Sequence, residues 1–409
     1  MKSLEWIATL AAPQGELANV QRNGRESLLG IGFPSRKLEH WRLTDFKRLE
    51  NLLELPISKG IKDSSSIRNK SWAEKASHGT RIVLDPQQNY ESIELPPGLR
   101  KLNSEELKQH LSNNFGHLSI SQNWPLAINQ AITNQLLALR VEGQELAKLE
   151  LVMPAEKNSL TPTRVIILME EKAKLQLLQV ALGAENSAHS HVLEIHLGKD
   201  SELNHGFVAL GGGNASCLAQ ISVKQQASSN YSLTTIQHGW SLSRLEPEII
   251  QVEGQGQTTL RGLQISTKKQ QLATHSRVRF EGPEGCLNQL QKAAAIENSH
   301  SIFNGVIQVP QIAQKTNASQ LSRNLLFSNQ ARIDTKPELE IVADDVRCAH
   351  GATISHLQED ELFYLRSRGI ASNQARSLLL QGYCQEIIDA LPMEANRWDI
   401  LNTLLESVQ

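Results

Sequence analysis

The middle of the chain, from about residue 156 to 345, alternates apolar and polar residues in short segments, and this period constrains the fold more than any other feature. Residues 260–266 and 287–293 are examples, although neither alternates perfectly. A period near two is typical of strands that bury one face. Roughly a dozen such segments follow one another, interrupted by Gly, Asn and Ser, with little helical pattern between them. The central zone is therefore predicted to be mainly β.

Three architectures can accommodate such a series of strands: a sandwich, a barrel and a β-solenoid. The period alone does not choose among them. Aromatic residues make up only 4% of the chain, and the central segments are rich in Gln, Asn, Thr and small apolar residues, which stacked coils tolerate. Composition therefore favours the solenoid, although no strict sequence repeat marks its coils.

Residues 1–155 are expected to form a mixed, largely helical N-terminal region. Several of its segments have apolar residues spaced three and four apart, as a half-buried helix requires. These segments are 15–29, 44–55, 104–113 and 125–139. Residues 58–78 are rich in Lys and Ser and are expected to be an exposed connection.

Residues 346–409 are expected to form a C-terminal helical region. Its first helix, at about 359–368, has acidic residues in the first turn, Arg366 and Arg368 in the last turn, and Gly369 just past its end. Two further helices are expected at about 371–391 and 393–407. Such a group of terminal helices can cap a solenoid or dock a partner.

Composition and charge exclude several classes of function. A net charge of -2 over 409 residues provides no electrostatic surface for nucleic acid or for an anionic membrane. No apolar run approaches the about 20 residues that span a bilayer. The glycines at 211–213 and at 254 and 256 are not followed by the Lys and Ser/Thr of a phosphate loop, so they are predicted to be solenoid corners.

The cysteines and the start of the chain favour a cytoplasmic protein. The four cysteines, at 217, 286, 348 and 384, are too few and too scattered for a disulfide framework in a chain of this length. The first residues lack the apolar core of a secretory signal and the Arg-rich pattern of a transit peptide. A reducing, cytoplasmic compartment is therefore expected.

One short motif carries metal-ligand chemistry: Cys348 and His350 are two residues apart and can share one face of a strand. A thiolate and a neutral imidazole bind iron, copper or zinc, but two ligands are only half of a closed tetrahedral site. Packing explains an isolated Cys-x-His more often than metal binding does, by roughly four to one. Further ligands would have to come from elsewhere.

Two other groups of titratable residues are weaker candidates. On a predicted strand His189 and His191 face one side and Glu194 and His196 face the other, so these four do not converge on one metal ion. Asp344 and Asp345 are adjacent, and neighbours on a strand point to opposite faces. They are therefore predicted to form a turn or a cap at the end of the β core rather than a catalytic pair.

Several spaced motifs, in one order, carry a resemblance to a known family. They are AQKTNA at 313–318, KPELEI at 336–341, DDVRCAHGAT at 344–353, FYLRSRGI at 363–370 and, near the start, KLEHWRLTD at 37–45. In these motifs the chain resembles the SufD-like members of the SufB/SufD family, which belong to the SUF system of iron–sulphur cluster assembly. It departs from the family pattern at Leu43, where an aromatic residue is more typical, and at Ala349, where Ser is.

The resemblance implies a right-handed parallel β-helix core flanked by helical N- and C-terminal regions. It implies a non-catalytic chain that pairs with a SufB-like paralogue through the β-helix and holds SufC, an ABC-type ATPase, through its C-terminal helices. A homodimer through the same β surface is an alternative for the chain alone.

The resemblance also assigns roles at the interface. His350 matches a family histidine that lies opposite a SufB thiolate and helps to hold nascent iron or cluster, and Cys348 matches a nearby position of less defined role. No cofactor is expected to remain bound to this chain, because iron or cluster would be transient and shared with SufB.

Two rival functions make different demands on the sequence. A SufB-like cluster scaffold would be longer and would supply its own cluster thiolates. A β-solenoid that acts on carbohydrate would carry acids and an Arg or Lys converging on an exposed groove, together with an export signal. The absence of Cys-x-x-Cys and of such a signal favours the SufD-like adaptor.

Overall fold

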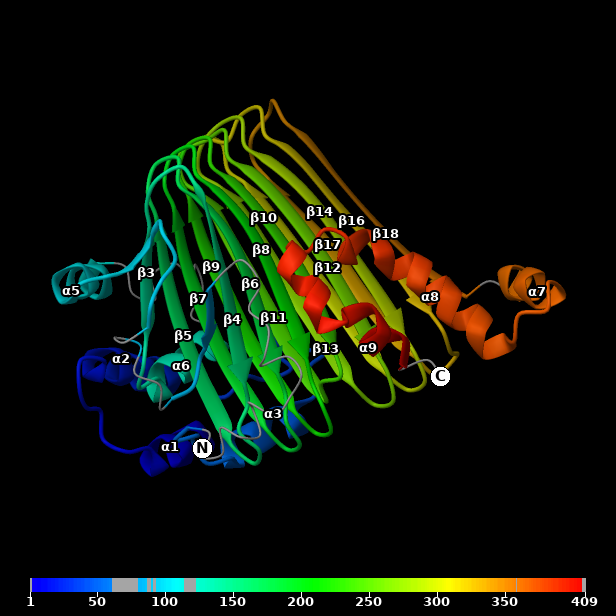
Figure 1. Cartoon of the computed structure of the whole chain (residues 1–409), viewed down its shortest axis with the longest axis horizontal. Coiled ribbons are helices and arrows are strands. Elements are labelled where there is room, and N and C mark those ends of the chain that lie inside the picture. The colour runs from blue at the N-terminus through cyan, green and yellow to red at the C-terminus, as the bar shows by residue number, and fades with distance from the viewer. Residues whose placement is uncertain are drawn as a thin grey trace.

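The computed structural model describes residues 2–60, 80–86, 90, 93–113, 123–357 and 359–406. In this part of the chain the central residues form two nine-stranded sheets (Figure 1). Successive strands from β3 to β18 alternate between the two sheets, so two strands make one coil and about eight coils stack. The core is therefore a parallel β-solenoid.

The two sheets are named here A and B. In spatial order sheet A consists of β17 (Arg332–Ile341), β15 (His300–Val309), β13 (Gln271–Phe280), β11 (Leu242–Gln251), β9 (Ser216–Gln225), β7 (Ala188–Leu197), β5 (Leu160–Met169), β3 (Leu137–Val141) and β2 (Leu99–Lys101). Sheet B consists of β1 (Thr80–Val83), β4 (Leu146–Pro154), β6 (Lys174–Leu182), β8 (Glu202–Leu210), β10 (Asn230–His238), β12 (Gln257–Ser266), β14 (Cys286–Ala295), β16 (Asn317–Leu326) and β18 (Arg347–His356).

Helical elements precede and follow the solenoid. Those before it are α1 (Lys2–Thr9), α2 (Ala18–Ile31), η1 (Glu39–Trp41), α3 (Phe46–Glu54), α5 (Ser104–Asn113) and α6 (Trp124–Ile132). Those after it are α7 (Glu359–Ser367), α8 (Ser372–Ile388), η3 (Met393–Trp398) and α9 (Ile400–Glu406).

Each corner from the β4–β5 connection to the β15–β16 connection contains a residue with positive φ. Asn158, Lys172 and Asn186, for example, have φ of 55°, 60° and 52°. This left-handed conformation is unfavourable for residues other than Gly, and Asn is among the few that adopt it readily. Lys, Glu, Gln and Ser also occupy it here, so the corners recur in geometry without recurring in sequence. This explains why the coils show no strict sequence repeat.

Alternate residues of every strand fill the space between the sheets, and most of them are apolar and buried. A buried chain of hydrogen bonds also crosses this interior. Thr163 contacts Nδ1 of His191 at 2.7 Å, the amide of Gln179 bridges Nε2 of His191 (3.1 Å) and Nε2 of His205 (3.0 Å), and the hydroxyl of Tyr231 lies 3.0 Å from Nδ1 of His205. The polar atoms that bridge these coils are thus paired with one another, as buried polar groups must be.

The Gln179 amide fixes the tautomers of both histidines. Its NH2 group donates to Nε2 of His191, so that ring carries its proton on Nδ1 and donates it to Thr163. Its carbonyl oxygen accepts from Nε2–H of His205, whose Nδ1 then accepts from Tyr231. Both rings are neutral in this arrangement. Burial accordingly lowers the pKa of each histidine to about 3.

The N-terminal helices cover the outer face of sheet A. Trp41 of η1 and Trp124 of α6 meet edge to face, with ring centroids 5.8 Å apart, and both are buried. Helix α2 packs closely on α6 at Gly24, where a Cβ atom would lie 2.4 Å from the backbone nitrogen of Ala131. Only glycine allows so close an approach.

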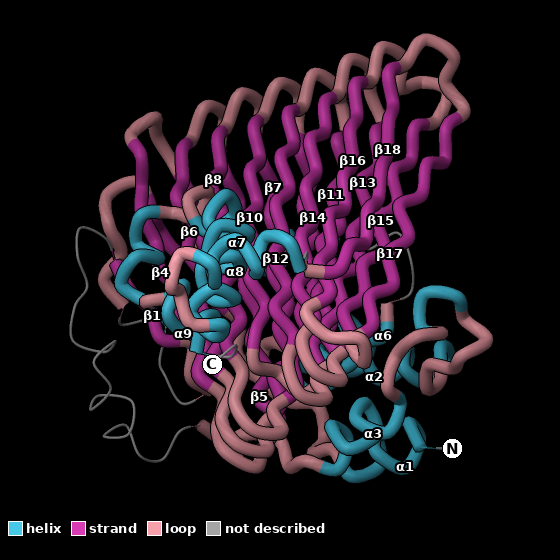
Figure 2. The backbone as a smooth tube through the Cα atoms, turned by 90° about the vertical axis from the view of Figure 1, so that its right-hand side faces the viewer, coloured by secondary structure: helices cyan, strands magenta, loops and turns pink. Residues whose placement is uncertain are grey.

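The C-terminal segment runs back across the outer face of sheet B, from the last coils toward the first (Figure 2). Tyr383 donates to the backbone carbonyls of Ala293 in β14 and Arg323 in β16. Further along, Ala390 accepts from Thr234 of β10, and Pro392 lies against Gly206 of β8.

Before α9 the segment reaches a buried carboxylate of the first full coil. Glu150 of β4 accepts hydrogen bonds from Arg397 and from the indole of Trp398, and it also forms an ion pair with Arg81 of β1 at 2.7 Å. Removing one member of such a buried pair typically costs several kcal/mol, because the other charge remains buried. Arg397 and Trp398 therefore fasten the C-terminal helical region firmly to the start of the solenoid.

The predicted solenoid with helical regions at both ends is confirmed. Its strands extend beyond the expected limits of 156–345, because β3 and β4 precede residue 156 and β18 lies after 345. The C-terminal helices accordingly begin only at Glu359 rather than at 346. The prediction of one helix at 125–139 is wrong: α6 ends at Ile132 and β3 begins at Leu137. The apolar residues of 137–141 suit either element, and such short runs are ambiguous.

Other local predictions have mixed outcomes. Gly369 has φ of 86° and ends α7 as expected, and Gly213 and Gly254 lie in corners with positive φ. The single helix expected at 393–407 is instead two elements, η3 and α9, because Asp399 between them has a left-handed φ of 46°. The expected connection at 58–78 lies mostly outside the described residues.

Within the described residues no helix is both long enough and apolar enough to cross a membrane.

The buried histidines predict that the fold weakens in mild acid. Their pKa is lowered on folding, so the unfolded chain binds more protons below about pH 6.5, and stability present above that pH is lost as the pH falls toward the folded-state pKa. At about pH 5 each fully buried histidine, such as His191 or His205, lowers the free energy of unfolding by about 2 kcal/mol. We therefore expect the free energy of unfolding, measured by urea denaturation, to be lower at about pH 5 than at about pH 7.5.

The variant His205→Gln should reduce that difference by about 2 kcal/mol, whatever its stability at neutral pH. His356→Gln, which changes an exposed histidine of β18, should leave the difference unchanged. An equal pH dependence in the parent and in His205→Gln would contradict the assignment.

Candidate functional site

The solenoid ends in an open coil made of β17 and β18. Each of these strands is the last of its sheet and pairs with a neighbour on one side only. Residues that continue the interior rows are therefore exposed here, including Ile341 at 40% and Ile354 at 46%. An uncapped solenoid end with exposed apolar side chains is typical of a surface that another chain covers.

Cys348 and His350 both belong to this open end, and both lie in rows that face the solenoid interior. In the register of β16 with β18, Cys348 is the partner of Ala318 and His350 is the partner of Gln320. Ala318 and Gln320 are buried inside the preceding coil. The prediction that the thiol and the imidazole share one face is thus consistent with the strand geometry.

The two side chains differ in their surroundings. Cys348 is half-buried against the apolar core, and burial raises the pKa of its thiol, opposed in part by a hydrogen bond with the backbone of Ala318. A raised pKa disfavours the thiolate that binds metal. His350 is exposed, and its imidazole forms no hydrogen bond with another described residue. His350 is therefore the more available ligand of the pair.

No group of three or more His, Cys, Asp or Glu side chains in the described ranges is placed to hold a metal ion. The histidines of β7 have the alternation expected of them: His189 and His191 point into the interior, whereas His196 contacts His110 of α5 on the outer face, at 4.9 Å between ring centroids. Glu194, on that outer face, pairs with Arg164.

The exposed edges of the last coil differ in composition. β17 carries Arg332, Asp334, Lys336, Glu338 and Glu340, with Pro337 among them. Charges and proline on an edge strand discourage pairing with a further strand. β18 has neither a proline nor an Asp, Glu, Lys or Arg from Cys348 to His356. Of the two edges, β18 is thus the one suited to pair with another chain.

A groove of about 490 Å³ runs beside the open end on the outer face of sheet B, with His350 and Gly351 at its margin. Arg261 and Arg323 line it from β12 and β16, and Glu386 of α8 lines it from above. Lys292 pairs with Glu386 at 2.6 Å and lowers the pKa of that carboxyl. The groove is therefore rich in positive charge close to the Cys-x-His motif.

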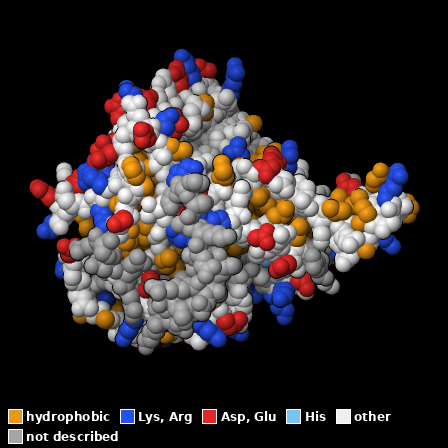
Figure 3. Space-filling view, viewed as in Figure 1, with side chains coloured by type: hydrophobic (Ala, Val, Ile, Leu, Met, Phe, Trp, Pro, Cys, Tyr) orange, Lys and Arg blue, Asp and Glu red, His pale blue; other side chains and the backbone are white. Residues whose placement is uncertain are grey.

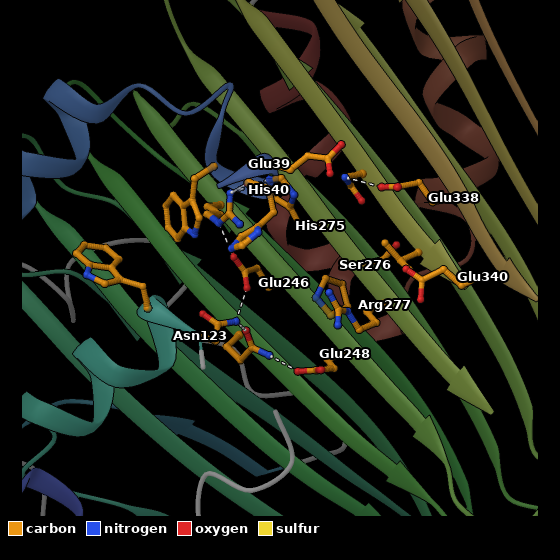
Figure 4. A pocket seen from close by; sticks show the side chains of 17 residues that line it. Glu39, His40, Asn123, Glu246, Glu248, His275, Ser276, Arg277, Glu338 and Glu340 are labelled. Carbon is orange, nitrogen blue, oxygen red and sulfur yellow. Dashed lines mark hydrogen bonds and ion pairs between the residues drawn. The ribbon is translucent and has the colours of Figure 1, made fainter. Parts of the chain in front are cut away.

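A second cavity, of about 230 Å³, lies on the opposite side of the solenoid, between η1, the start of α6 and the outer face of sheet A (Figure 4). Arg244 organises its wall: the guanidinium stacks on Trp41 at 3.9 Å, donates to the carbonyl of His40 and to Nε2 of His275, and pairs with Glu246. Asn123 donates to Glu246 from the other side.

Only one sequence motif pointed to this cavity, KLEHWRLTD at 37–45. That motif includes η1, which forms one wall of the cavity. The remaining lining residues come from the start of α6 and from β9, β11, β13, β15 and β17, and they range from Asn123 to Glu340 in the sequence. Only the register of the coils brings them together.

Comparisons with known proteins agree with this architecture. A family model described as SUF system FeS cluster assembly, SufBD core domain, matches residues 152–383. An iron-sulfur cluster assembly SufBD family protein of Synechocystis sp. is 30% identical over 96% of this chain and 92% of its own length. Protein ABCI7, chloroplastic, of Arabidopsis thaliana is 28% identical over 92% of this chain and 83% of its own length.

The iron-sulfur cluster assembly protein SufD of Escherichia coli is 31% identical over 53% of this chain and 48% of its own length. Fold and comparisons together define a β-solenoid protein of iron–sulphur cluster assembly. The chain belongs to the SufBD family of the SUF system.

Proposed function

We propose that this chain is the SufD-like subunit of a SUF complex: a non-catalytic adaptor that pairs with a SufB-like chain through its open coil and holds the SufC ATPase through its C-terminal helices. The observation that carries the proposal is the uncapped end of the solenoid, where Cys348 and His350 lie on interior rows that no further coil of the described chain covers.

The edge of β18, which lacks charged residues and proline from Cys348 to His356, supports pairing with a second solenoid. A strand of the partner can continue sheet B by main-chain hydrogen bonds, and the exposed apolar residues of the open end supply buried area. The same surface can pair with a second copy of this chain when the paralogue is absent. In the complex, His350 would supply one imidazole to iron or cluster in transit, and thiolates of the partner would complete the ligand set.

The cysteines support the adaptor reading over a SufB-like scaffold. All four are free, and Cys217 and Cys384 are buried, where desolvation raises the pKa of each thiol to about 12. Burial and a raised pKa make these two thiols poor metal ligands. Free cysteines also fit the reducing cytoplasm, which we propose as the compartment.

Helix α7 supports the proposed docking of the ATPase. It has no buried residue, and it projects beyond the solenoid (Figure 1). Phe363 and Tyr364 on it are 72% and 59% exposed, and apolar side chains gather on this lobe (Figure 3). Isolated helices of this length are marginal in water. A partner that covers the two aromatic rings would stabilise α7.

The first test is co-expression of this chain with a SufB-like chain and SufC, followed by size-exclusion chromatography with light scattering. We expect an assembly that contains one copy of this chain, one SufB-like chain and two SufC chains. Ile354→Lys places a charge on β18 at the open end and should weaken the pairing at least about 10-fold. Leu29→Lys, at a similarly exposed position on α2, is the control.

An Ile354→Lys variant that assembles as fully as the control would contradict pairing through the open coil. A chain that elutes alone in the presence of both partners would remove the adaptor role. A stable cluster reconstituted on this chain in isolation would reverse the choice in favour of a SufB-like scaffold.

The role of His350 predicts a specific loss. In the assembled complex, His350→Ala should lower the yield of cluster, measured by its visible absorbance and acid-labile sulphide. His356→Ala removes another exposed histidine from the same row of β18 and should leave the yield unchanged. An unchanged yield with His350→Ala, in a complex of normal composition, would contradict the role of His350 as a ligand.

The role of α7 predicts a separable defect. Phe363→Ser should reduce co-purification of SufC at least about 10-fold, because a buried aromatic anchor commonly contributes 2 kcal/mol or more. Since α7 has no buried residue, the thermal stability of the chain alone should not change. Leu29→Ser serves as the matched surface control. Normal retention of SufC by Phe363→Ser would exclude α7 as the docking element.

A further inference from the structure

We propose that the cavity on sheet A binds a small zwitterion, an α-amino acid, whose carboxylate pairs with Arg277 and whose ammonium group pairs with a carboxylate of the cavity wall. This inference is independent of the adaptor role, because the cavity lies on the opposite sheet from the groove beside His350.

Arg277 has a guanidinium that faces the cavity without a partner among the described residues (Figure 4). Its neighbour in the register is Glu248 of β11. Parallel strands lie about 4.8 Å apart, so the two charges could pair, yet no ion pair joins them. Two residues along the same face, Arg279 is paired with Glu281 at 3.0 Å. Arg277 is thus positioned to pair with an anion inside the cavity.

His275 provides a second unused donor on the same strand. Arg244 donates to Nε2 of His275 at 2.8 Å, so Nε2 accepts and the proton of the neutral ring lies on Nδ1. This Nδ1 atom is buried and has no hydrogen-bond partner among the described residues. Burial also lowers the pKa of His275, which keeps the ring neutral. A buried unpaired N–H is costly, so this ring is a polar group of the wall that the described chain leaves unsatisfied.

The carboxylates of the wall are not equivalent. Glu246 is paired with Arg244, and Glu338 is paired with Lys336 at 2.9 Å. Glu340 receives a hydrogen bond only from the neutral amide of Gln308, at 2.6 Å, and has no cation partner in the described chain. Glu39 is paired with Lys336, and Glu248 accepts from the amide of Gln220 at 3.4 Å. Arg277 and Glu340 thus have no oppositely charged partner among the described residues.

This pattern selects the charge of the ligand. A phosphate or a simple dianion would meet Arg277 but would be repelled by the glutamates that line the cavity, and a simple amine would be repelled by Arg277 and Arg244. A zwitterion compensates both unpaired charges at once. The volume of about 230 Å³ lies below the about 300–1,000 Å³ of pockets for drug-sized ligands, which limits the ligand to a small metabolite.

The test is isothermal titration of the purified full-length chain with each of the common amino acids. We expect at least one to bind with one site per chain. Arg277→Gln should weaken that binding by roughly 10- to 100-fold, as expected for loss of a charge-assisted hydrogen bond, and Glu340→Gln should weaken it to a similar extent. Arg279→Gln, on the same strand and face, should bind normally.

Two chemical analogues of the bound amino acid test the two contacts separately. The amide of its carboxyl group should lose the contact with Arg277, and the N-acetylated form should lose the contact with Glu340, so both should bind at least about 10-fold more weakly. Absence of binding by every amino acid, equal binding by Arg277→Gln and Arg279→Gln, or equal binding by either analogue would overturn the proposal. Because Glu340 is exposed, the Glu340→Gln variant provides a readout even if Arg277→Gln fails to fold.

Discussion

The in-register parallel stacking of coils is the constraint on which the rest of the structure depends. Each side chain lies directly over its partner one coil away, so a polar residue in the interior must find its hydrogen bond in an adjacent coil or within its own. Gln179 shows how this is met: one amide holds two histidines, one from each sheet, in complementary tautomers. The same rule places Cys348 over Ala318 and His350 over Gln320, and it assembles the wall of the cavity on sheet A from five strands.

The stack of coils has two ends, and the two ends differ in how they are covered. The first coils are covered by β1, β2 and the N-terminal helices, whereas the last coil is left open in the described chain. A parallel coil without a successor exposes both backbone donors and interior side chains. The charged residues and proline of β17 discourage pairing with a further strand, whereas β18 lacks such residues from Cys348 to His356. Only one of the two edges at this end is therefore protected against strand pairing. The exposed interior rows and the edge of β18 are the features that suit this end to the proposed assembly.

Sequence patterns predicted the strands, the flanking helices and the alternation that separates His191 from Glu194, because these follow from local period alone. They did not predict where the solenoid begins and ends. Residues 137–141 and 347–356 are strands because they add to an existing sheet, and their own apolar pattern is too short to decide. Cys348 and His350 were identified from their spacing, but their place on interior rows depends on the register. Arg277 could not be identified from the sequence, because an arginine on a strand usually has an ion-pair partner and only the structure shows that its neighbours leave it unpaired.

The C-terminal segment connects distant parts of the molecule in a way that has a mechanical consequence. It leaves the last coil, crosses β14, β10 and β8 in turn, and is anchored at Glu150 in the first full coil. It therefore links the last coils to the first along the outer face of sheet B. A load applied at the projecting α7 is not borne by the last coil alone but is shared along the length of the solenoid through these contacts. A pull on α7 is thus expected to strain the contacts with β14, β10, β8 and Glu150 together rather than one after another.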